Sequence, residues 1–315
     1  MSFYRSFEAV VSASGPGIID WDAVDSAARE GIEPGSIALT EQEKQAYADD
    51  VKDAKANISE FSSIEFEIPD QIEIQNRYHW IDSNIEMFKR VLVAFEEQPG
   101  TLPGLTRVVN TGSMAAALSF LANHVLGQYD PLLLAESDIH ELYIVHPNVV
   151  RTAAELDIEF ERFRRWIVLH EVTHAAEFGA APWLADYLEN RLEENIEAIK
   201  QREFSREGLQ EINLVMTTIE GFAELLMDEA FDREYIDLRK KVESKRKGSD
   251  PVTRLFKRIL GLGLKRQQYE RGAEFFRTIV SDYDIETATR VWDAPENLPA
   301  ENELDNPHRW VTRIQ

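Results

Sequence analysis

The sequence predicts an α+β fold that is predominantly α-helical and contains one small sheet. Apolar residues recur at helical spacing over most of the chain from Arg77 onwards. Two T-x-x-E patterns, which begin at Thr40 and Thr152, are typical of capping boxes at the starts of helices. One short run rich in β-forming residues, at positions 142–145, indicates a strand.

The composition fits a globular protein with an unusual charge. The chain has 315 residues, enough to bury a sizeable core, and 43% of them are hydrophobic. Its 57 acidic and 34 basic residues give a formal net charge of -23, which excludes nucleic acid and anionic membrane as partners for the surface as a whole. Lysine is the minor part of the basic complement, which consists mainly of arginine. We therefore expect a halophilic surface adapted to high salt; an ordinary acidic protein is the alternative.

The chain contains no cysteine, which excludes disulfides, thiolate catalysis and cysteine-based metal sites. Its first residues lack the basic-then-apolar pattern of a secretory signal. No apolar run reaches the roughly 18 residues that a membrane-spanning helix needs. From these observations we expect a soluble protein with a cytoplasmic location.

A change in composition near residue 70 predicts two parts. Residues 1–70 are dense in acids and in Gly-Pro turns, and they contain one convincing helix, from Thr40 towards Ile58. We expect this part to be an acidic appendage. Residues 71–315 carry the longer helical periods, and we expect them to form the main, functional domain.

The prediction of a sheet depends on two short runs of β-forming residues. Residues 142–145, Leu-Tyr-Ile-Val, are followed by His146-Pro147-Asn148, which ends the strand. Residues 105–109 are a second candidate strand. If the first strand flanks a cleft, an extended peptide can pair with it by strand addition.

A long helix is predicted from Thr152 to Phe178, where Gly179 provides a natural C-terminal stop. Its inward face is marked by apolar residues at helical spacing. His170 and His174 continue the same line, one turn apart. The apolar residues of this face are Leu156, Phe160, Phe163 and Ile167.

The segment from His170 to His174 reads H-E-V-T-H, an H-E-x-x-H motif. Two imidazoles four residues apart on a helix project side by side and can take two corners of a zinc tetrahedron. Glu171 lies next to the first histidine, where its carboxylate can accept a proton from a zinc-activated water. The motif therefore predicts a zinc site with Glu171 as the catalytic base.

Zinc needs a third protein ligand. The metzincin extension of the motif is excluded, because Glu177 and Ala180 stand where that class has glycine and histidine. The gluzincin arrangement instead takes a glutamate from a following helix. Glu177 itself is an alternative ligand, disfavoured because it follows His174 on the same helix.

A following helix is predicted from Gly208 to Ala230, and it carries Glu220 and Glu224 one turn apart beside its apolar line. Carboxylates directed towards a core are costly unless they are paired or bind a metal. We predict that Glu220 is the third zinc ligand. Glu224 would then accept the outer N–H of a ligand histidine. A solvated position on the helix surface is the alternative for both.

Two other residues are candidates for donating a hydrogen bond to the oxyanion of a transition state, Tyr269 and His308. The sequence does not choose between them. The remaining histidines stand singly and are expected to be packed or surface residues: His79, His124, His140 and His146.

Several separate motifs, in order, resemble the zincin-like metallopeptidase type 2 family, some of whose members carry the label "deazaflavin coenzyme biosynthesis-associated". The resemblance spans roughly Asn76 to Arg313 and is weaker over positions 1–70. It rests on Val125-Leu126-Gly127-Gln128-Tyr129-Asp130, Leu142-Tyr143 with Pro147-Asn148, Phe163-Arg164-Arg165-Trp166 before the histidine motif, Pro182-Trp183-Leu184, Ile219-Glu220-Gly221, Met227-Asp228, and Gln268-Tyr269 with Gly272.

The resemblance implies a zincin-like, mainly helical fold with a small sheet. It also implies His170 and His174 as zinc ligands, Glu171 as base and Glu220 as third ligand. The family's haloarchaeal members would account for the acid-rich, lysine-poor composition, so we expect a haloarchaeal origin.

Two classes of function follow. The first is a zinc-dependent hydrolase, a metallopeptidase that cleaves a peptide or amide substrate. The second is a zinc-containing binding or structural protein that is associated with cofactor metabolism and cleaves nothing. An intact Glu171 favours the hydrolase, since a purely structural zinc site has no use for a general base. A non-peptide amide or ester substrate is a third alternative.

Overall fold

The computed structural model divides into two compact units, each built from separate stretches of the chain. The first unit comprises residues 1–38, 71–152 and 196–203, and the second comprises residues 39–70, 153–195 and 204–315. The structure describes residues 9–11, 13–14, 17–67, 69, 72–92, 103–131, 140–201, 206–230, 238, 241 and 266–315.

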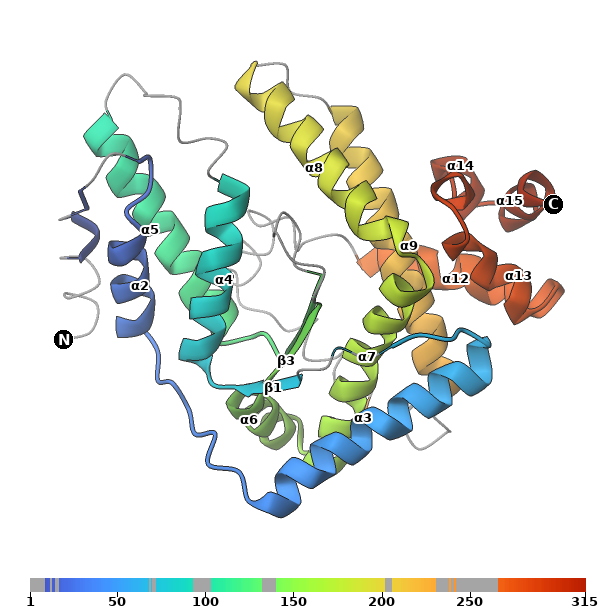
Figure 1. Ribbon diagram of the computed structural model, residues 1–315, viewed down its shortest axis with the longest axis horizontal. Helices are drawn as coiled ribbons and strands as arrows, with labels where there is room; N and C mark the ends of the chain where they lie inside the picture. The colour runs from blue at the N-terminus through green and yellow to red at the C-terminus, as the bar shows by residue number, and fades with distance from the viewer. Residues whose placement is uncertain are drawn as a thin grey trace. The chain divides into compact units, whose positions relative to one another are not determined.

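The predicted α+β fold, dominated by helices, is confirmed (Figure 1). The elements that begin in the first unit are α2 (Trp21–Glu30), β1 (Ile72–Gln75), α4 (Arg77–Leu92), α5 (Pro103–Ala122), β2 (Gly127–Asp130), β3 (Glu141–Val145) and α6 (His146–Leu156). Those that begin in the second unit are α3 (Glu41–Ser62), α7 (Phe160–Ala180), α8 (Trp183–Lys200), α9 (Arg206–Ala230), α12 (Arg266–Asp282), α13 (Ile285–Thr289), η3 (Arg290–Trp292), η4 (Pro295–Asn297), α14 (Glu301–Leu304) and α15 (Pro307–Ile314).

The first unit contains the sheet, in the order β1-β3-β2, with β1 parallel and β2 antiparallel to β3. The predicted strand at 142–145 is confirmed as β3, and all but its first residue are buried. Because β3 lies between two strands, both of its edges are already paired. The expectation that a peptide adds to this strand is therefore wrong; an added strand would need the outer edge of β1 or β2.

Three helices of the first unit, α2, α4 and α5, lie side by side and share one apolar core (Figure 1). Trp80, Ile81 and Leu118 are among its least exposed members. The candidate strand at 105–109 is wrong, since these residues lie inside α5. A short apolar run has the same appearance in a strand and in a buried helix, and the apolar positions that follow it continue the helix.

Residues 1–70, expected to be an appendage, are divided between the two units. Helix α2 belongs to the first unit and helix α3 to the second, and residues 9–11 of the first unit are also helical. The capping box at Thr40 is confirmed, with Thr40 Oγ1 accepting from the Glu43 backbone and the Glu43 carboxylate accepting from the Thr40 backbone. The chain passes from the second unit back to the first between residues 70 and 71, where the change in composition predicted a boundary, but it also crosses between the units after residue 38 and after residue 152.

In the second unit, α3 packs along α7 through a buried ion pair. Arg164 Nε donates to Asp50 Oδ2 at 2.7 Å, and the two side chains are 8% and 10% exposed. The rings of Tyr47 and Phe160 lie 5.3 and 5.5 Å from the guanidinium carbon. Residues from the expected appendage therefore support the helix that carries the histidine motif.

The start of that helix differs from the prediction. Thr152 and Glu155 lie within α6, the chain turns at Asp157 with a φ of 53°, and α7 begins at Phe160. Aspartate is one of the few residues that tolerate this left-handed conformation, which lets a new helix start where the pattern suggests continuity. Gly179 lies inside α7, which ends at Ala180, so the helix continues past the predicted stop.

The helices α9 and α12 touch backbone to backbone at two glycines. A Cβ added to Gly272 would lie 2.3 Å from the Thr217 carbonyl oxygen and 3.1 Å from Gly221 Cα. Glu220, the residue before Gly221, is thereby held on a helix whose position is fixed by close contact with α12. Within the described residues, no helix is both long and apolar enough to cross a membrane.

We predict that Asp50→Asn lowers the free energy of unfolding by about 3–5 kcal/mol, because it leaves the buried guanidinium of Arg164 without a charge partner. Urea unfolding followed by circular dichroism measures the change. The double variant Asp50→Leu with Arg164→Met removes both charges and should recover most of the loss. A single variant within about 1 kcal/mol of the parent would show that the ion pair does not hold α3 to α7.

Gly272→Ala is expected to lower the free energy of unfolding by about 1–3 kcal/mol, because the new methyl group forces α12 away from α9. Gly104→Ala is the matched control. Its added Cβ meets nothing within 4 Å, so replacing glycine in a helix should leave stability unchanged or raise it by up to about 1 kcal/mol. Thermal unfolding of both variants tests the contrast, and equal effects would contradict it.

Candidate metal centre

Helix α7 carries the H-E-x-x-H motif on its buried side. Phe163 and Ile167 are buried as predicted, and the line they begin continues to the two histidines. His170 is half-buried, and His174 is 9% exposed. The amphipathic period of the helix thus places both imidazoles at the edge of the core rather than in solvent.

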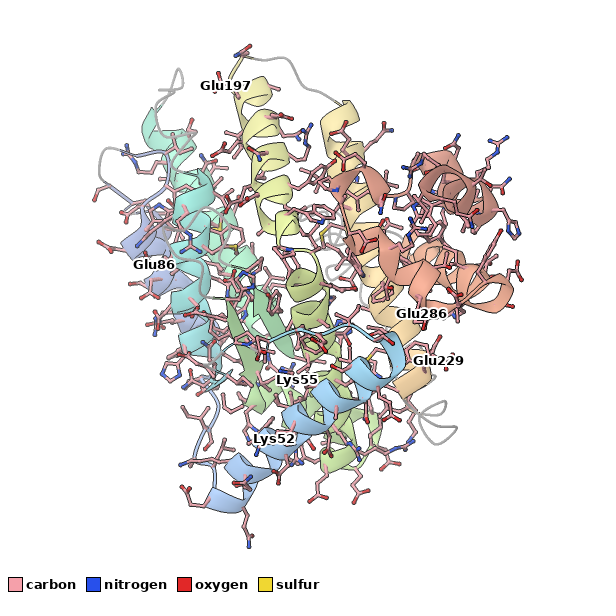
Figure 2. All side chains as sticks on the ribbon, turned by 45° about the vertical axis from the view of Figure 1, so that its right-hand side comes forward. Lys52, Lys55, Glu86, Glu197, Glu229 and Glu286 are labelled. Carbon is pink, nitrogen blue, oxygen red and sulfur yellow. The ribbon has the colours of Figure 1, made fainter. Side chains whose placement is uncertain are left out.

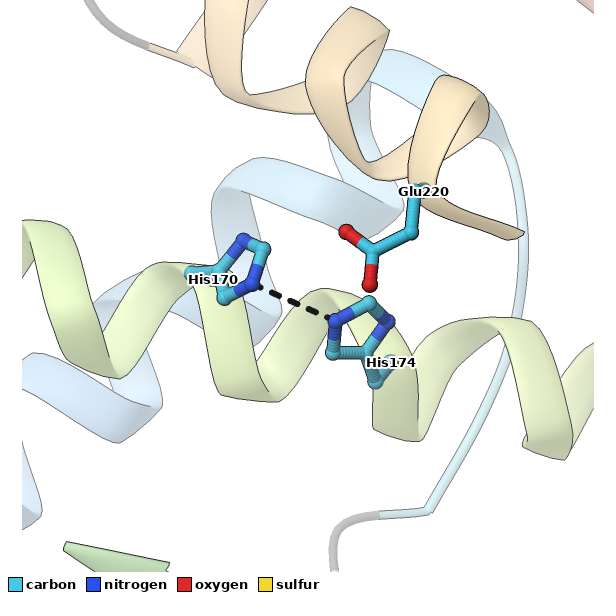
Figure 3. Close-up of side chains that lie close together, drawn as sticks. All are labelled: His170, His174 and Glu220. Atoms are coloured by element: carbon cyan, nitrogen blue, oxygen red, sulfur yellow. Dashed lines mark hydrogen bonds between the residues drawn. The ribbon is translucent and has the colours of Figure 1, made fainter. Parts of the chain in front are cut away.

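The two imidazoles lie edge to face, with centroids 4.7 Å apart and ring planes at 78°, and the carboxylate of Glu220 from α9 lies beside them (Figure 3). His174 Nε2 lies 3.3 Å from His170 Nε2. One ligand atom from each of the three residues lies within 4.8 Å of the other two. Among the described residues, this is the group of histidine and carboxylate side chains that could hold a metal ion. The three predicted ligands are brought together.

This donor set fits zinc. In a tetrahedral site with zinc–nitrogen bonds of about 2.0–2.1 Å, two nitrogens lie about 3.3–3.4 Å apart, which matches the separation of the two Nε2 atoms. Two imidazoles and one carboxylate leave the fourth position open, as in catalytic rather than structural zinc sites. The side chains of His170, His174 and Glu220 would therefore hold the ion.

A second carboxylate contacts the far side of the His174 ring. Glu177 Oε2 lies 2.8 Å from His174 Nδ1, and the Glu177 side chain is 0% exposed. Glu177 was expected at most as an alternative metal ligand, and the structure instead places its carboxylate on the outer nitrogen of a ligand histidine. A residue three positions after a histidine on a helix lies on the same face, so the H-x-x-E spacing was the available signal.

The charges around His174 favour a cation. Burial by itself would lower the pKa of His174, but the hydrogen bond and charge of Glu177, with the charges of Glu220 and Glu171, raise this pKa to about 9. Burial raises the pKa of the Glu177 carboxyl to about 7 against the opposing effects of His174 and the Ala223 backbone N–H. Three glutamates thus act on one imidazole, which suits a site for a positive ion.

The predicted base, Glu171, lies beside His170 on α7 and is 6% exposed. Its charge is one of those that raise the pKa of His174, so it acts electrostatically on that histidine. The half-buried indole of Trp166 lies beside His170. The two rings are nearly parallel, with centroids 6.4 Å apart. From the sequence, Trp166 was named only as part of a family motif and not as a residue of the site, although it precedes His170 by one helical turn.

Three further residues were predicted to assist the metal centre without binding the ion: Glu224, Tyr269 and His308. Glu224 lies one turn after Glu220 on α9 and is half-buried, and its predicted contact with a ligand histidine stays a prediction. Tyr269 lies in α12, and its side chain is outside the described residues. His308 is exposed on α15, where its ring nitrogens contact Tyr283 Oη at 3.2 Å and Asp282 Oδ2 at 3.4 Å.

Comparison with known proteins identifies a family and a shared fold. A family model described as zincin-like metallopeptidase matches residues 19–206 and 199–311. The match begins well before Asn76, inside the part expected to be an appendage. No curated protein matches the chain.

One solved structure is similar over almost its whole length. It is the crystal structure of a protein from Chloroflexus aurantiacus, proposed to be a hydrolase and described as having a novel fold. The two sequences are 29% identical, the match covers 94% of this chain and 98% of that chain, and the TM-score is 0.78. The two proteins therefore share a fold throughout.

We predict that Glu220→Gln weakens zinc affinity by more than about 100-fold, because it removes a charged ligand. Loss of a residue that only hydrogen-bonds to a ligand costs up to about 100-fold, and loss of the ligand itself should cost more. Competition with a chelator of known affinity measures the change. Glu229→Gln is the matched control on the same helix, since Glu229 is exposed near its end (Figure 2). Equal affinities in the two variants would remove Glu220 from the ligand set.

Proposed function

The chain belongs to the zincin-like metallopeptidase family, and from this premise we propose that it is a zinc-dependent hydrolase that cleaves peptide or amide bonds. The observation that carries the proposal is the convergence of His170, His174 and Glu220 from two helices. The resemblance in the motifs is thereby confirmed at the level of the family, and the hydrolase proposed for the Chloroflexus aurantiacus protein is consistent with it.

The residues divide the work between holding the ion and moving a proton. His170, His174 and Glu220 would hold zinc, which when bound would supply a Lewis acid that polarises a carbonyl and makes a water more acidic. Glu171 accepts the proton of the water whose oxygen bonds to the carbonyl carbon. The same carboxylate then gives that proton to the leaving nitrogen as the C–N bond breaks.

The auxiliary roles follow the placement of the helices. With Glu177 on the outer nitrogen of His174, Glu224 would serve the outer nitrogen of His170. We favour Tyr269 over His308 as the donor to the developing oxyanion. Helix α12, which carries Tyr269, packs on the helix of Glu220, whereas the His308 ring is already engaged by Tyr283 and Asp282.

We predict that Glu171→Gln retains zinc and loses about 10²–10⁴-fold in turnover, because the amide cannot accept the proton. Hydrolysis of casein and of peptide libraries in high salt supplies the assay, and zinc content is measured on the same samples. Glu161→Gln, at an exposed position on the same helix, should change neither value.

The outcomes separate the two classes of function. Full turnover by Glu171→Gln would remove this residue from the mechanism. No hydrolysis by the folded, zinc-loaded parent would instead favour a binding or structural protein. Hydrolysis restricted to small amides or esters would keep the protein a zinc-dependent hydrolase but replace the peptide substrate.

A further inference from the structure

Among the described residues of the second unit, Glu177 is the ionisable side chain that is buried most completely, and catalysis as proposed does not use it. Its carboxylate is 0% exposed. Oε2 bonds to His174 Nδ1, whereas the buried Oε1 makes no well-formed hydrogen bond within the described residues, although the Ala223 backbone N–H is near enough to lower the pKa of the carboxyl. A carboxylate in such a place costs several kcal/mol unless a positive charge balances it.

Among the described residues, positive charge can reach the Glu177 carboxylate only from the side of His174. No lysine or arginine in the described part of the chain pairs with Glu177, and Glu220 adds a further negative charge nearby. Its one ionic partner within those residues is the His174 ring. A balancing cation must therefore act through His174, either as a proton on the ring or as a metal ion at its other nitrogen.

The contact also fixes how the ring presents itself. A carboxylate oxygen can only accept, so the proton of a neutral His174 ring lies on Nδ1 and the lone pair lies on Nε2. That Nε2 atom is the one directed at His170 and Glu220. The same bond restricts rotation of the ring about its Cβ, which keeps Nε2 in place.

We propose that Glu177 is the positioning residue of the metal centre, which orients His174 through Nδ1 and uses its buried charge to favour a divalent cation at Nε2. This inference rests on the proposed zinc site. It assigns Glu177 a role distinct from those of the ligands and the base, because its carboxylate touches neither substrate nor ion. Histidine ligands generally need such an outer acceptor for full affinity.

Two substitutions separate the orienting bond from the charge. Glu177→Gln keeps an oxygen that can accept from Nδ1 but removes the charge, and Glu177→Met removes both at similar size. We expect Glu177→Gln to weaken Co²⁺ affinity about 10–100-fold. Glu177→Met should weaken it further and change the visible spectrum of bound Co²⁺, because the ring is no longer held.

The melting temperature gives an independent measurement. The parent should gain thermal stability when Co²⁺ is added, because the ion binds the native state and balances the buried carboxylate. Both variants should gain less. Glu303→Gln is the matched control: Glu303 is a 7% exposed glutamate paired with Arg313, so its loss should lower stability without changing Co²⁺ affinity.

The experiment distinguishes failure of this inference from failure of the proposed function. A parent protein that binds no Co²⁺ would overturn the metal centre itself. A parent that binds Co²⁺, with Glu177 variants of equal affinity and unchanged spectrum, would overturn the role of Glu177 alone. Loss of stability without loss of affinity, as in Glu303→Gln, would reduce Glu177 to a structural residue. If Glu177→Met does not fold, Glu177→Gln decides.

Discussion

The burial of ionisable side chains on one helix is the constraint on which the second unit depends. Helix α7 carries Arg164, Glu171, His174 and Glu177 towards the core, and all four are buried. Such groups are tolerated only with partners of opposite charge or with hydrogen bonds. Partners for two of them come from elsewhere in the chain: Asp50 from α3 for Arg164, and Glu220 from α9 beside His174.

These requirements account for the packing around α7. Helix α3 must lie close enough to pair with Arg164, so a segment of the expected appendage becomes part of the unit that holds the site. Helix α9 must present Glu220 to the histidines, and the glycine contact with α12 supports it from the other side. The site thus rests on α7 and α9, of which α7 is held to α3 by a buried ion pair and α9 to α12 by close backbone contact.

The electrostatic balance explains why the centre suits a divalent ion. Glu171, Glu177 and Glu220 act together on His174, and a single proton on the imidazole only partly compensates them. A dication held by two imidazoles and a carboxylate would neutralise more of this charge in a site of low exposure. The affinity of the centre for a divalent ion is therefore expected to depend also on Glu171 and Glu177, whose carboxylates are not ligands.

The sequence by itself determined the class of fold, the strand β3 and the pairing of the two histidines, because spacing along one helix or strand fixes which side chains share a face. Glu220 was predicted instead from the expectation that a following helix supplies the third ligand and from the family resemblance. The sequence named Glu177 only as a disfavoured alternative ligand. Only the tertiary structure decided that Glu177 lies behind His174, that α3 belongs with α7, and that β3 is paired on both sides. Those facts depend on contacts between segments far apart in the chain, which local periodicity does not encode.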